Sequence, residues 1–203
     1  MGSFLDDVYD ILFKPSRGME KVSREKNIWQ GFLVYLVVSV IVTLSNTASQ
    51  AGQMIEEFRG FPVSPELMEG MARFMPFLNL PLIPLYFFLF TAVLHLTVEL
   101  LGGEGRISRL GAVLGYGHIP YIFMLPVSLA ARYFPFNPTG FFSLAISIWA
   151  LVLKVNGIRN VYNISLGRAL VSYFLPFIFL FGLLVLFLLL AGILLGPFLA
   201  ELM

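Results

Sequence analysis

The chain has 203 residues, of which 58% are hydrophobic and only 12% are charged. Thirteen Lys or Arg residues against twelve Asp or Glu residues leave a formal net charge of +1. So few charges exclude an ordinary soluble domain and a disordered chain, and the lack of a basic excess argues against nucleic acid as a partner. The composition predicts a membrane protein whose main partner is the lipid bilayer. The sequence contains no cysteine, which excludes disulfides and thiol nucleophiles.

Residues 1–27 form a charged segment that we predict to lie in the cytoplasm. Residues 3–13 place apolar side chains at helical spacing, opposite three aspartates, Asp6, Asp7 and Asp10. Ser3 and Asp6 have the spacing of a capping box, and Pro15 is expected to end the helix. Two interpretations stay open for this amphipathic helix: it lies on the membrane surface, or it packs against the base of the helix bundle.

Five apolar runs follow, and each is predicted to cross the bilayer, which takes about 20 helical residues. Backbone amides need partners in lipid and the runs are too long for barrel strands, so all five are helices. The fourth run is short and is expected to borrow residues from its flanks. The predicted spans cover residues 28–48, 77–101, 110–131, 140–155 and 169–195. The predicted fold class is an all-α integral membrane protein, a five-transmembrane-helix bundle formed by residues 28–203.

Basic residues in the loops predict the orientation, because the side richer in Lys and Arg stays in the cytoplasm. Ten of the thirteen lie before the first span, between the second and third, or around the loop that joins the fourth and fifth, to which Lys154 is assigned. The other three are Arg59, Arg73 and Arg132. The split predicts a cytoplasmic N-terminus and an external C-terminus.

The longest loop, residues 49–76, contains a further predicted helix. Ser64 has the position of an N-cap, with Pro65 in the first turn. The helix is interpreted either as an interfacial lid over the outer end of the bundle or as a plain connector.

The sequence shows no catalytic motif: GxSxG, HExxH, the Walker loop and GxGxxG are all missing. The glycine-rich stretch 102–105 is typical of a tight turn between two spans. We therefore predict no enzymatic activity, no catalytic residues and no cofactor.

Three polar residues are expected at membrane depth, where burial is costly. His95 and Glu99 stand four residues apart on one face of the second span, and His118 lies on the third. By helix rise the two histidines lie about 9 and 12 Å deep, so they could meet between antiparallel neighbours. Three interpretations stay open: a divalent-metal site, a proton or ion relay, or structural hydrogen bonds to neighbouring helices.

Two GxxxG pairs, Gly111 with Gly115 and Gly192 with Gly196, lie on the third and fifth spans. Small residues let membrane helices approach closely. Packing inside the bundle is the favoured interpretation, and formation of a homo-oligomer is the alternative.

Five stretches resemble the Yip membrane-protein family in its short prokaryotic form. They are residues 13–15 (FKP), the glycine-rich turn 102–105, and residues 110–120 (LGAVLGYGHIP), 149–154 (WALVLK) and 164–169 (ISLGRA). The Gly-Tyr-x-x-x-Pro element that starts at Gly115 is the most recognisable piece. Together the stretches extend over nearly the whole chain.

The resemblance implies a five-helix bundle with a cytoplasmic N-terminus, in the plasma membrane of a prokaryote. Eukaryotic members of the family act in vesicle traffic between endoplasmic reticulum and Golgi and associate with Rab-type GTPases. Those members usually have a longer cytoplasmic N-terminal region than the segment of about 27 residues found here. The resemblance supplies no catalytic residues.

Two functional hypotheses follow. In the first, the protein is non-enzymatic and serves membrane organisation or a trafficking-like role, through lipid or through a protein partner on its cytoplasmic face. In the second, it is a small ion, metal or solute transporter or channel that uses His95, Glu99 and His118.

Overall fold

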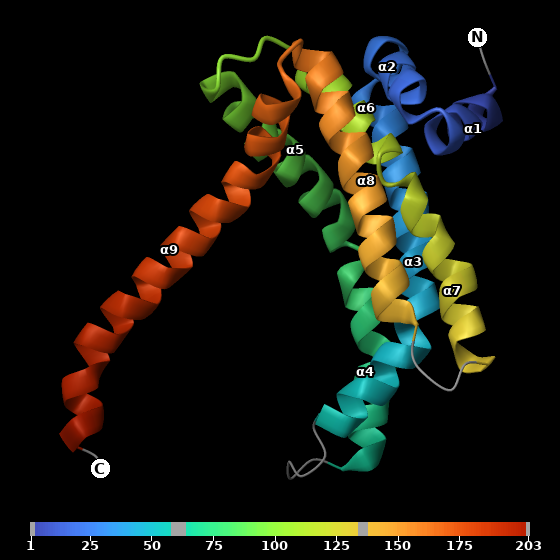
Figure 1. Cartoon of the computed structure of the whole chain (residues 1–203). Helices are drawn as coiled ribbons and strands as arrows, with labels where there is room; N and C mark the ends of the chain where they lie inside the picture. Colours follow the sequence, from blue (N-terminus) through green and yellow to red (C-terminus); the bar gives the residue numbers. More distant parts are fainter. Residues whose placement is uncertain (1–2, 58–63, 134–137, 202–203) are drawn as a thin grey trace.

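The computed structural model describes residues 3–57, 64–133 and 138–201, and these residues form helices and turns without any strand (Figure 1). In chain order the α-helices are α1 (Phe4–Phe13), α2 (Pro15–Glu25), α3 (Ile28–Glu57), α4 (Pro65–Asn79), α5 (Leu82–Leu100), α6 (Ile107–Tyr116), α7 (Met124–Ala130), α8 (Thr139–Tyr162) and α9 (Leu166–Glu201). Two short 3₁₀ helices, η1 (Ile119–Phe123) and η2 (Ala131–Tyr133), adjoin α7. The predicted all-α fold class is confirmed.

Four segments among the described residues are long and apolar enough to cross a membrane. They are Leu82–Leu100, Ile107–Ala130, Thr139–Tyr162 and Leu166–Ile193. The described apolar part of α3, Ile28–Leu44, is shorter. The described residues of this membrane protein therefore contain four candidate spans and one shorter apolar helix, where the sequence predicts five full spans.

Helix α8 is longer than predicted, since it runs from Thr139 to Tyr162 rather than from residue 140 to 155. It ends where Asn163 adopts the left-handed backbone conformation with a φ of 51°, which Asn tolerates better than most residues. Lys154, assigned above to a cytoplasmic loop, therefore lies inside a spanning helix, about 12 Å from its end. This reduces from ten to nine the number of basic residues on the side that the sequence predicts to be cytoplasmic.

The third spanning segment is divided. Helix α6 ends at Tyr116, and after Gly117 and His118 the chain continues as η1 and then α7. Pro120 stands near the start of η1, where its missing N–H prevents an α-helical hydrogen bond. Residues 110–117 are all buried, whereas most of α7 is exposed. The break places His118 at the point where the span changes from a buried to an exposed helix.

Helices α3 and α6 are in close contact where glycines of both helices face each other. A Cβ atom on Gly115 would overlap the backbone carbonyl of Gly31, and one on Gly111 would overlap the side chain of Ile28. The glycine pair of the third span therefore lies in a contact within the chain, where only a bare backbone fits. Gly192, by contrast, has no neighbouring atom within 4 Å of such a Cβ, and the surroundings of Gly196 lie outside the described part of the chain.

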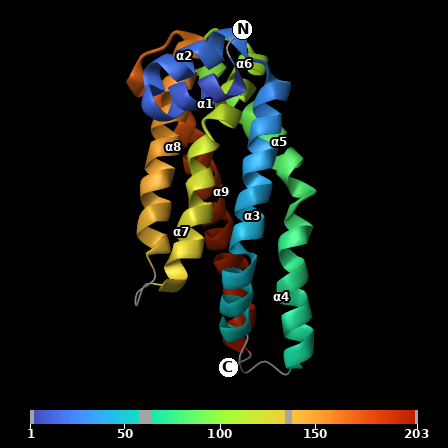
Figure 2. The ribbon, with the colours of Figure 1, turned by 90° about the vertical axis from the view of Figure 1, so that its right-hand side faces the viewer.

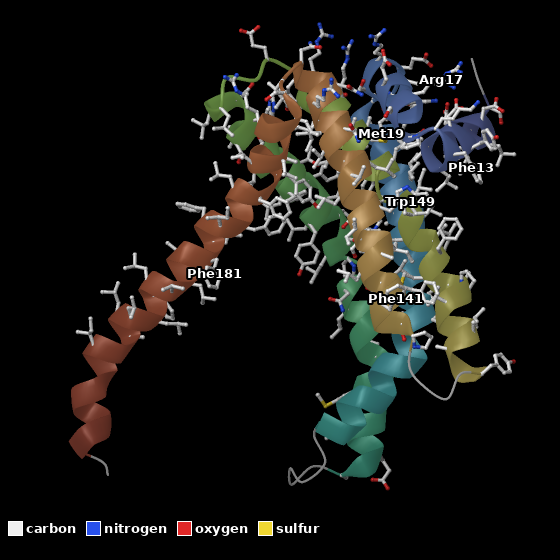
Figure 3. All side chains as sticks on the ribbon, viewed as in Figure 1. Phe13, Arg17, Met19, Phe141, Trp149 and Phe181 are labelled. Atoms are coloured by element: carbon white, nitrogen blue, oxygen red, sulfur yellow. The ribbon has the colours of Figure 1, made fainter. Side chains whose placement is uncertain are left out.

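Helices α1 and α2 pack against each other at one end of the bundle, where α2 packs against α6 and α8 (Figures 1 and 2). We call α1 and α2 the base layer. Ile11, Met19 and Val22 are fully buried in the same core cluster as residues of α6 and α8. Met19 reaches α8, where a Cβ on Gly157 would come within 2.8 Å of its terminal methyl group (Figure 3). Of the two interpretations left open for the N-terminal helix, this packing matches the second.

Asp7 is buried in the base layer, where its carboxylate forms ion pairs with two lysine ammonium groups. Its carboxylate oxygens are 2.6 Å from Lys21 Nζ and 2.5 Å from Lys26 Nζ. Burial acts to raise the pKa of the Asp7 carboxyl, but hydrogen bonds to the two lysines outweigh it, so that pKa lies below its usual 3.8. The bond to Asp7 likewise raises the pKa of Lys21 above 10.5. Asp7 thus faces inward, which corrects its predicted place on the exposed polar face.

Helix α4 begins after Ser64, whose hydroxyl oxygen accepts a hydrogen bond from the Leu67 amide at 3.3 Å. The helix runs beside the second half of α3 and leads through a turn into α5 (Figure 2). The α3–α4 pair extends beyond the ends of α7 and α8 and does not fold over them (Figure 1). This position favours the connector interpretation of the 49–76 segment over a lid.

We expect Gly115→Ala to lower the free energy of unfolding by about 3 kcal/mol, because the added methyl group forces the α3 and α6 backbones apart. Thermal unfolding of the detergent-solubilised protein, followed by tryptophan fluorescence, measures the effect. Gly192→Ala is the matched control, and it should cause no loss of stability. Equal melting temperatures for the wild type and Gly115→Ala would show that the α3–α6 contact is not tight.

We expect Asp7→Asn to lower the melting temperature by several degrees at neutral pH, because it removes the carboxylate between Lys21 and Lys26. The folded pKa of Asp7 is depressed, so its contribution is complete above the unfolded pKa of about 3.8 and is lost as the pH falls through the lower folded pKa. The difference between wild type and variant should therefore shrink in acid. Asp10→Asn is the control, and a difference that stays constant with pH would contradict the assignment.

Candidate functional site

A cleft of about 600 Å³ lies between α5 and the first half of α9, with α3, α6 and α8 as its floor. Its walls are aromatic and aliphatic. They include Tyr86, Phe87, Leu89, Phe90 and Val93 from α5 and Tyr173, Pro176, Phe177 and Leu180 from α9. The floor is formed by Tyr35, Leu114, His118 and Lys154. The cleft is thus an apolar groove with two basic side chains at its bottom.

The spacing of the wall residues explains why the two helices present these side chains to each other. On α9, Tyr173, Phe177 and Leu180 repeat every three or four residues and share one helix face. Phe90 closes the end where the helices meet, since its ring centroid lies 5.9 Å from Tyr173 and 5.7 Å from Phe177. Beyond this contact α9 leans away from α5, and Phe181 lies on the diverging part (Figure 3). The cleft occupies the start of this divergence.

Lys154 projects from α8 into the floor of the cleft. Its aliphatic stem covers Gly117, where an added Cβ would lie 2.7 Å from Lys154 Cγ. Its ammonium lies 5.8 Å from the ring centroid of Tyr121, a cation–π distance. No carboxylate of the described residues lies within ion-pair distance of this ammonium. Burial of a charge at membrane depth costs free energy unless a counter-charge lies nearby. Lys154 is therefore the residue of the cleft that most needs an anionic partner.

His118 lies beside Lys154 on the same floor. Its ring sits between Tyr35 and Tyr121, with centroid distances of 4.6 and 4.5 Å. Its Nδ1 atom is buried and has no hydrogen-bond partner among the described residues. The floor therefore presents one cation, Lys154, beside an imidazole ring whose Nδ1 atom is buried without a partner among the described residues.

His95 and Glu99 lie elsewhere, at the contact between α5 and α8. The His95 Nδ1 atom is 2.5 Å from the Tyr162 hydroxyl, and its Nε2 atom is 3.4 Å from Glu99 Oε1. The Glu99 side chain is 49% exposed. His95 thus takes part in a hydrogen bond between helices, the structural interpretation left open above.

The predicted set of His95, Glu99 and His118 is not brought together. His95 contacts Tyr162, whereas the ring neighbours of His118 are Tyr35 and Tyr121. Within the described residues no three His, Asp or Glu side chains come close enough to hold a metal ion. The physical reason is the break after α6, which places His118 in the turn before η1, with its ring between Tyr35 and Tyr121.

Lys154 is not among the residues predicted from the sequence. The predicted fourth span ends at residue 155, which places the lysine at the very end of the span and groups it with the loop that follows. Two residues further along the sequence indicate where the helix ends. Asn163 suits the left-handed conformation at the end of a helix. Ser165 suits the start of the next helix, where its hydroxyl accepts a hydrogen bond from the Arg168 amide at 3.4 Å. With the helix end moved to Tyr162, an intramembrane lysine would have been evident.

A family model described as the Yip1 domain matches residues 9–199. Among curated proteins and among solved structures, none matches the chain significantly.

Proposed function

The chain belongs to the Yip1 domain family of membrane proteins, and from this premise we propose that it acts without catalysis, by binding an anionic lipid in the cleft between α5 and α9. Lipid contact of this kind would serve the membrane organisation expected from the sequence. The observation that carries the proposal is Lys154, a cation without a carboxylate partner among the described residues, at the floor of an apolar groove.

The apolar groove suits the acyl chain of a lipid, and the lysine suits its anionic headgroup. An acyl chain fits walls made of Phe90, Val93, Phe177 and Leu180, because burial of apolar surface there needs no polar partner. An anionic headgroup supplies the counter-charge that Lys154 lacks. A zwitterionic or neutral lipid offers less of this compensation, so the proposal includes a preference for negative charge.

The depth of Lys154 supports a headgroup at this position. From Thr139 to Lys154 helix α8 rises about 22 Å, less than the hydrocarbon thickness of about 30 Å. The rest of α8 packs against the base layer, which contains the charged residues of the N-terminal segment. Lys154 would then lie near the hydrocarbon boundary on the side of the base layer, where headgroups of that leaflet are within reach.

The transporter alternative gains no support from this geometry. His95 and Glu99 do not line the cleft, and the cleft walls are almost entirely apolar. Ions would find one lysine and one histidine at the floor rather than the set of acidic and imidazole ligands that the sequence suggested.

For the topology we propose five crossings, with α3 as the first and the base layer in the cytoplasm. Support comes from the arrangement of α3, α5, α7 and α8, which run alongside one another from the base layer (Figures 1 and 2). Charged side chains also gather at the base-layer end of the molecule (Figure 3).

The lipid proposal predicts that Lys154→Met lowers the amount of bound anionic lipid about tenfold relative to zwitterionic lipid, since a charge-assisted hydrogen bond is lost. The measurement is native mass spectrometry of protein taken from vesicles of equal phosphatidylglycerol and phosphatidylcholine content. Val93→Trp, which fills the cleft and keeps the charge, should reduce binding of both lipids.

Lys14→Met is the matched control, because Lys14 is an exposed lysine outside the cleft. It should leave the lipid ratio unchanged. If Lys154→Met kept the wild-type preference for phosphatidylglycerol, the cleft would not be the site of anionic lipid binding and the proposal would fail.

The topology proposal predicts opposite labelling of two single cysteines, for which the cysteine-free chain is a suitable background. Tyr133 is 89% exposed at the end of η2, and Ser165 is exposed between α8 and α9. A membrane-impermeant maleimide should label Tyr133→Cys in intact cells and Ser165→Cys only after the membrane is disrupted. The reverse pattern would place the base layer outside the cell, and labelling of both on one side would remove a crossing.

A further inference from the structure

A second pocket, of about 390 Å³, lies where α2, the start of α6 and the end of α8 meet. It differs from the cleft in its polar lining. Three arginines, Arg24, Arg109 and Arg159, reach it from three different helices. The remaining polar residues that line it are Glu20, Ser23, Asn160 and Asn163. We call it the arginine pocket.

The arginine pocket has more positive than negative charge. Glu20 is its one carboxylate, and that group is paired with Arg24 at 2.8 Å. Neither Arg109 nor Arg159 has a carboxylate within ion-pair distance among the residues that the structure describes. Two unpaired guanidinium groups that share one concavity repel each other, and a bound anion removes this repulsion.

The positions of these groups are set by buried neighbours. Ser23 is 2% exposed and donates its hydroxyl to the Glu20 carbonyl at 2.7 Å, which fixes the turn of α2 that carries Arg24. On the other side the left-handed conformation of Asn163 ends α8 and brings Asn163 to the same rim as Asn160. The helix segments that carry the exposed arginines are thus held by the packed base layer and by the end of α8.

We propose that the arginine pocket binds a phosphate group. A guanidinium presents parallel N–H donors that match phosphate oxygens, and side-chain amides supply further donors. The volume admits a phosphate together with part of the group that bears it. The phosphate could belong to a lipid headgroup of the nearby leaflet or to a soluble phosphate compound, and both present the same chemistry to the pocket. This site shares no residue with the cleft.

The test uses the full chain in nanodiscs and the double variant Arg109→Gln/Arg159→Gln. In one arm the discs contain phosphatidylcholine only, and binding of inorganic phosphate and pyrophosphate is titrated from solution. In the other arm phosphatidic acid is added to the discs, and its retention is measured by native mass spectrometry. We expect saturable wild-type binding in at least one arm, weakened at least tenfold by the double variant and weakened further by salt.

Two controls separate this site from its surroundings. Arg17→Gln removes an exposed arginine of α2 that does not line the pocket, and it should leave binding unchanged (Figure 3). In the soluble arm Lys154→Met should bind phosphate normally, and in the lipid arm the double variant is compared with its parent in the Lys154→Met background, so that phosphatidic acid held in the cleft does not affect the result. Binding only in the soluble arm assigns a soluble phosphate, and binding only in the lipid arm assigns a headgroup. The absence of binding in both arms, or wild-type binding by the double variant, would overturn the proposal.

Discussion

The contact between the backbones of Gly31 and Gly115 is the constraint on which the rest of the structure depends. It brings the backbone of α3 against that of α6 without an intervening side chain. A residue larger than glycine at position 115 would not allow so short a distance between the two backbones. Tyr35, one turn along α3, can then reach the ring of His118 just after α6 ends. Tyr35, His118 and Leu114 together form much of the cleft floor. A wider separation of the two helices would remove that floor.

The base layer supports the same arrangement from the end of the bundle. Asp7 joins α1 to Lys21 of α2 and to Lys26 just beyond that helix, and Met19 packs on Gly157 of α8. A carboxylate buried between two ammonium groups is stable only if all three stay together, because the removal of one partner leaves an uncompensated charge. The layer therefore fixes the end of α8, and with it the position of the arginine pocket.

Helix α8 contributes one basic residue to each of the two proposed sites. Lys154 and Arg159 have different surroundings, and we therefore propose different ligands for them. Lys154 faces an apolar cleft at membrane depth, where an amphiphile can supply both a counter-charge and an acyl chain. Arg159 lies five residues further on, in a polar pocket beside Arg109 and the asparagines. In our proposals the same positive charge pairs with an anionic lipid in the cleft and with a phosphate group in the arginine pocket. The difference follows from the local dielectric and from the shape of the wall.

The sequence by itself determined that the chain is a helical membrane protein, since apolar runs of this length leave the backbone no other hydrogen-bonding solution. It also located the glycine pair of the third span and the capping signals at Ser3 and Ser64. Only the tertiary structure decided that Asp7 faces inward, that His118 is separated from His95 and Glu99, and that Lys154 lies within a span. Periodicity and local signals report the preference of each helix alone. Which faces meet depends on how closely the backbones approach and where a helix breaks, and those are properties of the packed whole.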